Sequence, residues 1–207
     1  MTKNSIGIVE LSSIAAGYSS SDEMLKAANV EMLLARSICS GKYMVMVGGE
    51  VADVESSVAA GIEISEGAII DSAVLSNIDP SVFPAISGAN PVDELDALGV
   101  IESFSVTSLL EAADAAAKAA DVQLIEIRLA MALGGKAFVT LTGNVSAVQA
   151  AIDAGANLVS EKGLLVHKVV IPRPHENLLN VGVIPRFVSA KGASADLTRQ
   201  RPPQAEI

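Results

Sequence analysis

The sequence predicts an α+β fold that is built twice, as two tandem copies of one domain with an antiparallel sheet and flanking helices. The first observation is a repeat. Ser5–Glu10 returns as Ala97–Glu102, and Lys26–Val30 returns as Lys118–Val122, both 92 positions later. The second is that both copies show the same order of strand and helix patterns. A fixed repeat decides the architecture, and about ninety residues per copy can enclose a core.

The first half of copy one predicts a strand, a helix and a hairpin. Residues 6–11 form a β-branched run that is typical of a strand. A helix is expected over Met24–Asn29, because Ser21 and the two acidic residues after it suit a helix start. The apolar stretches 30–38 and 43–47 then flank Ser40 and Gly41, and this arrangement predicts a hairpin-like loop.

The second half of copy one predicts a helix and a closing strand. Four apolar residues recur at helical spacing and indicate an amphipathic helix: Val51, Val54, Val58 and Ile62. Residues 68–76 follow as a strand. Copy two repeats the order, with strands near 98–103, 123–130, 137–142 and 164–171 and helices near 106–120 and 145–159. Strand, helix, two strands, helix and strand give the split βαβ, ferredoxin-like arrangement.

The repeat also predicts the domain boundaries. We expect a first domain over residues 1–88 and a second over 98–184. Residues 89–97 collect turn formers and charges and predict a linker. Residues 185–207 are polar, and we expect a mobile tail there because such a segment has little apolar surface to bury.

Composition excludes two classes of partner. The 207 residues carry a net charge of −10, and the cations are scattered, so a nucleic-acid surface is not expected. No apolar run is long enough for a membrane span, and the first residues lack an apolar signal core, which predicts a cytoplasmic protein. The 50% hydrophobic content suits either subunit interfaces or a tightly packed monomer, and composition leaves both open.

The sequence contains no recognisable catalytic residues, so we do not expect an enzyme. His167 and His175 have no spacing typical of a metal site. The Gly134-Gly135-Lys136 run lacks the earlier glycine and the following Ser or Thr of a phosphate-binding loop.

Cys39, the single cysteine of the chain, is the one residue whose side chain could bind a metal or react. It suits a small buried hydrophobe, but a loop cysteine beside glycine is also accessible to metals. Copy two has Leu133 at the corresponding place. A threefold axis through this loop would bring three thiolates together, enough for three irons of a [4Fe–4S] cluster.

The two copies together resemble the bacterial microcompartment shell family. The resemblance is carried by the strand opening at 6–10, the helix ends at Lys26 and Lys118, the Gly-Lys loops at Lys42 and Lys136, and the segment 171–175. Two complete copies in one chain are similar to the tandem-domain branch, in which three chains build a pseudohexagonal tile with a central opening. The resemblance covers roughly residues 5–180.

This resemblance implies a homotrimer in a compartment shell in the cytoplasm, in edge-to-edge contact with other shell proteins. It places six residues around the opening: Ile38, Ser40, Gly41, Leu133, Gly134 and Gly135. It places three cations at the tile edge: Lys26, Lys118 and Arg173.

Within the branch, residues 37–42, 80–88 and 161–166 are most similar to members from propanediol-utilisation compartments. Those members hold a [4Fe–4S] cluster through a pore-loop cysteine. The resemblance thus implies one cluster per trimer on Cys39 of three chains, with electron transfer across the shell and redox enzymes inside as partners. This chain departs from them at Ser40, where they have Pro, and in residues 185–207. A metabolite-conducting pore without a cluster and a cytosolic ligand-binding regulator stay open as alternatives.

Overall fold

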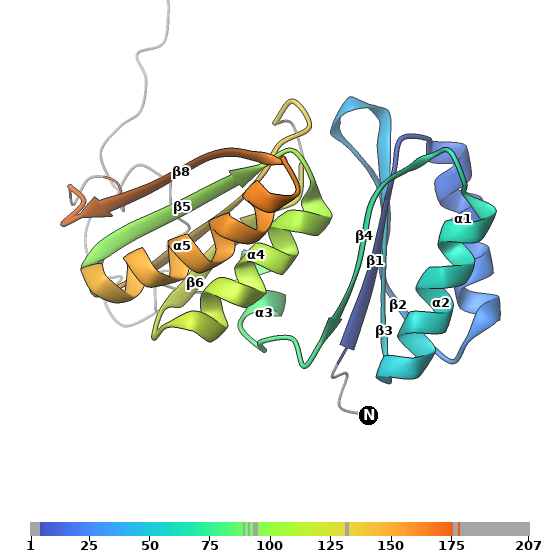
Figure 1. The fold of residues 1–207 in the computed structure, drawn as a ribbon, viewed down its shortest axis with the longest axis horizontal. Coiled ribbons are helices and arrows are strands. Elements are labelled where there is room, and N and C mark those ends of the chain that lie inside the picture. Colours follow the sequence, from blue (N-terminus) through green and yellow to red (C-terminus); the bar gives the residue numbers. More distant parts are fainter. Residues whose placement is uncertain are drawn as a thin grey trace, which may run out of the picture.

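The computed structural model describes residues 5–88, 90, 92, 95–130, 133–175 and 178, and these form two α+β domains (Figure 1). The first domain contains β1 Ser5–Leu11, α1 Ile14–Ala27, β2 Glu31–Ile38, a short 3-10 turn Cys39–Gly41, β3 Lys42–Gly49, α2 Val51–Ile64, β4 Ile69–Ser76 and α3 Val82–Ile86. The second contains β5 Ala97–Ser103, α4 Val106–Ala119, β6 Gln123–Arg128, β7 Ala137–Gly143, α5 Val145–Glu161 and β8 Leu165–Pro172. The predicted tail at 185–207 lies outside the described residues.

Each domain has a four-stranded sheet with the same strand order. The orders are β2-β3-β1-β4 and β6-β7-β5-β8, and neighbouring strands run antiparallel. The register also repeats. Glu10 of β1 lies opposite Asp71 of β4, and its counterpart in the repeat, Glu102 of β5, lies opposite His167 of β8. The α+β prediction with two tandem copies is confirmed.

The first helix begins ten residues earlier than the sequence predicts. It starts after Ser13, whose side-chain oxygen accepts a hydrogen bond from the N–H of Ala16 at 3.3 Å. The predicted start was wrong because the serines in the middle of this helix suggested a helix start. The hydroxyl of Ser21 instead donates to the carbonyl of Gly17 one turn back, at 2.7 Å, so it is satisfied inside the helix.

A short helix, α3, follows the last strand of the first domain and was not predicted. Its start is set by Asp79, whose carboxylate accepts hydrogen bonds from the N–H and the hydroxyl of Ser81, at 2.9 and 2.5 Å. Five helical residues are too few for a periodic signal in sequence.

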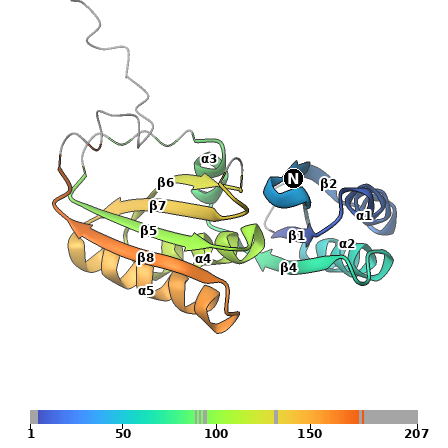
Figure 2. The same ribbon diagram turned by 90° about the horizontal axis from the view of Figure 1, so that it is seen from above.

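The sheet of the first domain is covered on both faces (Figure 1). On one face, residues such as Val9 and Val45 pack in a cluster with residues of α1 and α2. On the other, Ile6 and Ile8 join one continuous core with residues of α3 and with residues of α4, which belongs to the second domain. Seen from above, α4 and α5 run along one face of the second sheet (Figure 2). Helix α4 is therefore shared between the two domains.

Candidate functional site

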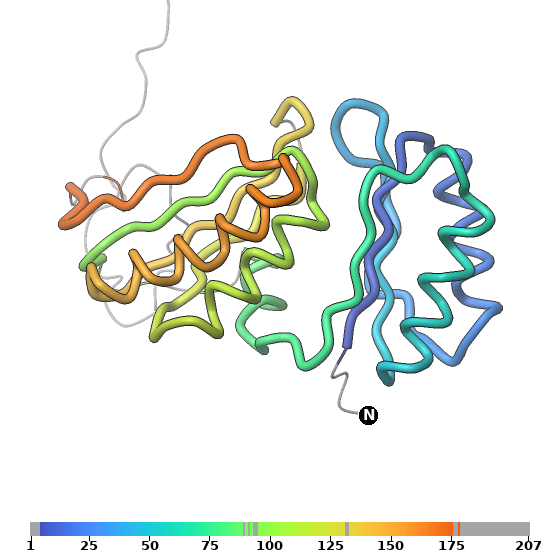
Figure 3. The backbone as a smooth tube through the Cα atoms, viewed as in Figure 1, coloured from blue at the N-terminus to red at the C-terminus, as the bar shows by residue number. Residues whose placement is uncertain are grey.

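The two predicted pore loops, β2–β3 and β6–β7, meet at one edge of the molecule (Figure 3). Cys39 joins them. Its N–H donates to the carbonyl of Ala130 at 2.8 Å, and its Sγ accepts the N–H of Leu133 at 3.4 Å. A hydrogen bond to sulfur favours the anionic thiolate. The half-buried thiol of Cys39 thus lies against the second loop of its own chain.

The backbone of the first loop explains why Ser rather than Pro occupies position 40. Ser40 has a φ of 64° and Gly41 has a φ of 73°. Proline has its φ fixed near −65° and could not adopt this conformation. Serine tolerates it at a cost of about 1 to 2 kcal/mol. A proline at position 40 would therefore require a different backbone conformation in this loop.

The other predicted pore residues differ in exposure. Ser40, Gly41 and Gly134 are exposed, and Leu133 is half-buried. Ile38 and Gly135 are buried within the single chain. Among the described residues of one chain, no three side chains of His, Cys, Asp or Glu lie close enough to hold a metal ion.

A buried polar cluster joins the two domains and was missed by the sequence interpretation. Glu10, with no exposed side-chain area, lies at the start of α4. Its Oε2 accepts the hydroxyl of Ser105 at 2.8 Å and the N–H of Val106 at 2.9 Å, while Oε1 accepts from Lys42 at 2.9 Å. Lys42 also donates to the carbonyl of Phe104 at 3.0 Å. A carboxylate is favoured there because the start of a helix carries partial positive charge.

Asp71 extends this cluster. Its Oδ2 accepts the hydroxyls of Ser105 at 2.7 Å and Ser108 at 2.6 Å, and Oδ1 lies 3.4 Å from Nζ of Lys162. Burial pushes the pKa of Asp71 upward, but the two hydroxyls and the Lys162 ammonium favour the carboxylate and hold the pKa below its usual value. Because Ser105 has one hydroxyl proton, it donates to either Glu10 or Asp71 at any moment.

Asp71→Asn should make the domain junction less stable and less sensitive to acid. At pH 7 we expect a loss of about 2 kcal/mol in the free energy of unfolding, since hydrogen bonds to a charged acceptor are lost. A depressed pKa stabilises the fold above the unfolded value, near 4, and this contribution disappears as pH falls through the folded value. Urea unfolding from pH 7 down to pH 3 should show the two proteins converging; a constant difference would contradict the role of Asp71.

A sequence signal for this cluster did exist. Ile6, Ile8 and Glu10 share one face of β1 because side chains alternate along a strand. A carboxylate at the end of an otherwise buried apolar face needs a partner. The partner could not be named, because Ser105 lies 95 positions away in the chain.

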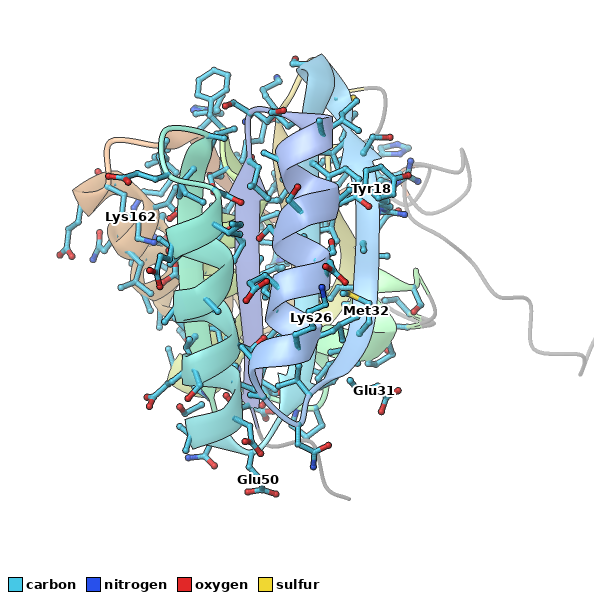
Figure 4. All side chains as sticks on the ribbon, turned by 90° about the vertical axis from the view of Figure 1, so that its right-hand side faces the viewer. Tyr18, Lys26, Glu31, Met32, Glu50 and Lys162 are labelled. Carbon is cyan, nitrogen blue, oxygen red and sulfur yellow. The ribbon has the colours of Figure 1, made fainter. Side chains whose placement is uncertain are left out.

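The three predicted tile-edge cations are exposed. Lys26 projects from the end of α1, where Figure 4 labels it, and pairs with Asp22. Lys118 takes the same place at the end of α4 and pairs with Asp114 at 2.5 Å. Arg173 follows β8 and is exposed. Their contact with other tiles stays a prediction.

Comparison with known proteins identifies the family. The BMC domain model matches twice, over residues 5–78 and 97–174. The bacterial microcompartment shell protein PduT of Citrobacter freundii is 46% identical over 173 residues, which cover 84% of this chain and 94% of that protein. The shell protein EutM of Escherichia coli K12 is 41% identical over 103 residues, covering 50% of this chain and all of EutM.

A solved structure supports the arrangement of the two domains. The crystal structure of a microcompartment protein from Desulfitobacterium hafniense DCB matches with a TM-score of 0.76 and 51% identity, and covers 85% of this chain and 98% of that one. No described helix of this chain could span a membrane. These relatives are compartment proteins rather than enzymes, as the sequence predicted. The chain belongs to the BMC domain family, the family of these microcompartment shell proteins, and carries two copies of the domain.

Proposed function

We propose that the chain is a structural tile of a bacterial microcompartment shell, in which three copies close a ring of six domains. The observation that carries this proposal is the double match to the BMC domain, together with two relatives that cover 84% and 85% of this chain. A tandem of two similar domains closes such a ring when three chains meet head to tail. The ring would tile edge to edge with other shell proteins.

We further propose that three Cys39 side chains, one from each chain, hold one [4Fe–4S] cluster at the axis of this ring. The residues fit such a group, because the single thiol of the chain lies half-buried beside the exposed Ser40 and Gly41, and its Sγ accepts the N–H of Leu133. The bound cluster would supply one-electron transfer across the shell, with redox enzymes inside as partners. The protein would contribute the thiolates, the hydrogen bond to sulfur and the surrounding loops.

A pore without a cluster is the second candidate. It is favoured by the contact of Cys39 with its own chain, since a thiol that accepts the N–H of Leu133 is already satisfied without metal. In that case the loops would conduct small metabolites.

The experiment that separates these candidates uses the full chain, purified and reconstituted without oxygen. Sedimentation should give the mass of a trimer, and chemical assay should give about four irons and four sulfides per trimer. A trimer without stoichiometric iron would favour the pore. A folded monomer at micromolar concentration would contradict the tile itself.

Lys26→Asp should abolish sheets of tiles while leaving the trimer intact. Lys26 is exposed at a helix end, and a long cationic side chain there can bond backbone carbonyls across a tile edge. The change reverses its charge and shortens its reach. Electron microscopy of concentrated protein would show the sheets, and sedimentation would show the trimer. Sheets that form as in the wild type would refute the edge role.

A further inference from the structure

The charges of this chain are unevenly distributed. Residues 5–88 contain eleven Asp and Glu but only three Lys and Arg, whereas residues 95–175 contain eight and six. Residues 185–207, which lie outside the described part of the chain, contain four cations and two acids. The cations are Arg186, Lys191, Arg199 and Arg201. The acidic first domain and the basic segment 186–201 are therefore complementary in charge.

One groove on the first domain is suited to a basic side chain. It lies between α1 and α2, which run side by side on the face that Figure 4 shows. A hollow of about 390 Å³ in this groove, called the Glu63 groove below, is lined by Glu23, Ala60, Glu63 and Ile64. Glu63 is exposed, and Ile64 is 56% exposed. A long cationic side chain can cover Ile64 with its aliphatic stem while its charged head meets both carboxylates.

The two carboxylates of the groove have no ion-pair partner among the described residues. Glu23 and Glu63 form no salt bridge within that part of the chain. Lys26, one turn beyond Glu23, pairs with Asp22 instead, and Asp22 raises the pKa of Lys26 more than Glu23 does. The Glu63 groove therefore carries negative charge that no described cation neutralises by direct contact.

The second domain has the same groove without the carboxylates. Helix α4 begins 92 residues after α1, and α5 begins 94 residues after α2, so Glu23 and Glu63 correspond to Ala115 and Asn157. The apolar part is retained in Leu158, which is 42% exposed. The fold therefore does not require acids at these positions. Leu158 stays exposed although α4 beside it packs on the first domain, so packing of α1 against another chain would leave the Glu63 groove open.

We infer that the basic segment 186–201 of one chain docks in the Glu63 groove of a second copy. A lysine or arginine of the segment would lie along Ile64 and donate hydrogen bonds to Glu23 and Glu63. Hydrogen bonds between ionised groups are about twice as strong as those between neutral groups. The inference rests on the proposed trimer, which brings the copies together, and it gives a role to a segment that lies beyond both BMC domains.

The length of the chain favours a second copy over the same chain. Leu178, the last described residue, packs in a cluster with Leu98 of the second domain, whereas α1 and α2 lie on the far side of the first domain (Figure 1). A flexible segment from Leu178 to Arg199 spans about 25 Å on average, but two domains side by side span about 50 Å or more. In a head-to-tail ring the first domain of the next chain adjoins the second domain and is therefore nearer.

Weak binding is sufficient because the segment is tethered. A flexible tether gives an effective concentration of about millimolar, so an affinity of about 0.2 mM would keep the segment docked about five-sixths of the time. Charges on a surface are screened within about 10 Å at 0.1 M salt. Docking should therefore weaken as the salt concentration rises.

Trypsin digestion of the full-length trimer tests the docking, because a cation held in the groove cannot enter the protease. Glu23→Gln combined with Glu63→Gln should speed cleavage after Lys191 and Arg199 about fivefold, since cleavage follows the undocked fraction. High salt should bring the wild type close to the rate of this groove variant. Mass spectrometry of the released fragments measures the rates.

Glu50→Gln combined with Glu55→Gln is the matched control. Both residues are exposed and lie outside the groove, and Figure 4 labels Glu50 at the start of α2. The control removes the same charge as the groove variant, and its cleavage should match that of the wild type. Equal acceleration by both double variants, or no acceleration by the groove variant, overturns the docking while the trimer stands.

A carbodiimide, which joins a lysine to a nearby carboxylate, identifies the chain that supplies the groove. In trimers assembled from isotope-labelled and unlabelled full-length chains, cross-links between Lys191 and Glu63 should join chains of different mass. Cross-links confined to chains of one mass, or none at all, overturn the docking on a second copy. A wild-type chain that sediments as a monomer overturns the trimer and the docking together.

Discussion

Cys39→Ser is expected to remove all iron, all sulfide and the broad visible absorption of the anaerobically reconstituted protein. A hydroxyl is a far poorer ligand for these irons than a thiolate, and the chain has no second cysteine to replace it. Iron content should fall from about four per trimer to none. Iron and sulfide assays, together with the absorption spectrum, measure the change.

The same variant should keep its fold and its trimer. A serine hydroxyl can still accept the N–H of Leu133, so the contact between the loops is retained. We expect the free energy of unfolding to change by less than about 1 kcal/mol. Ser37→Ala, two residues before Cys39 at the end of β2, is the matched control and should keep its iron. Iron retained by the Cys39 variant would exclude this residue as a ligand.

Glu10→Ala is expected to destabilise the chain by about 3 to 5 kcal/mol, because it removes a fully buried carboxylate and leaves the partly buried ammonium of Lys42 without its partner. The N–H of Val106 loses this acceptor, Lys42 keeps only the carbonyl of Phe104, and the hydroxyl of Ser105 keeps only Asp71. The gap left in the junction adds to the loss. Urea unfolding at pH 7, followed by circular dichroism, measures the free energy of unfolding.

Two further variants test whether the loss of stability comes from removing the buried carboxylate of Glu10. Glu10→Gln keeps the shape and one acceptor oxygen but places an amide near Lys42, so its loss should be intermediate. Glu55→Ala removes an exposed carboxylate and should stay within about 0.5 kcal/mol of the wild type. A Glu10→Ala protein as stable as this control would show that the junction does not depend on the buried carboxylate.

Most of the fold could be predicted because its signals are local. The strand at β1 and the amphipathic helix α2 follow from periodicity, and the repeat transferred both to the second domain. The start of α1 could not be predicted, because serine is equally suited to a helix cap and to the interior bonds seen at Ser21. Short α3 depends on a turn at Asp79 and has no periodic signal of its own.

The candidate site was predictable in part because the repeat allows its two copies to be compared. Cys39 is conspicuous because the repeat has Leu133 in its place. The hydrogen bond between these two positions, and the bond from Ser105 to Glu10, connect residues 94 and 95 positions apart. Such contacts form when one domain packs on the other, and no local sequence pattern predicts that packing.

The junction between Glu10 and α4 has a consequence for assembly. Because one chain carries both of its sides, it forms by folding, at an effective concentration of about millimolar that does not depend on how much protein the cell makes. In a ring of these chains every second junction is therefore complete before two chains meet. In the proposed ring, fusion of the domains halves the number of junctions that must form between separate chains, and so lowers the cost of assembly in translational and rotational entropy. Fusion also fixes the order of the two loops around the proposed ring. The loop with Cys39 and the loop with Leu133 must alternate, because every chain contributes one of each.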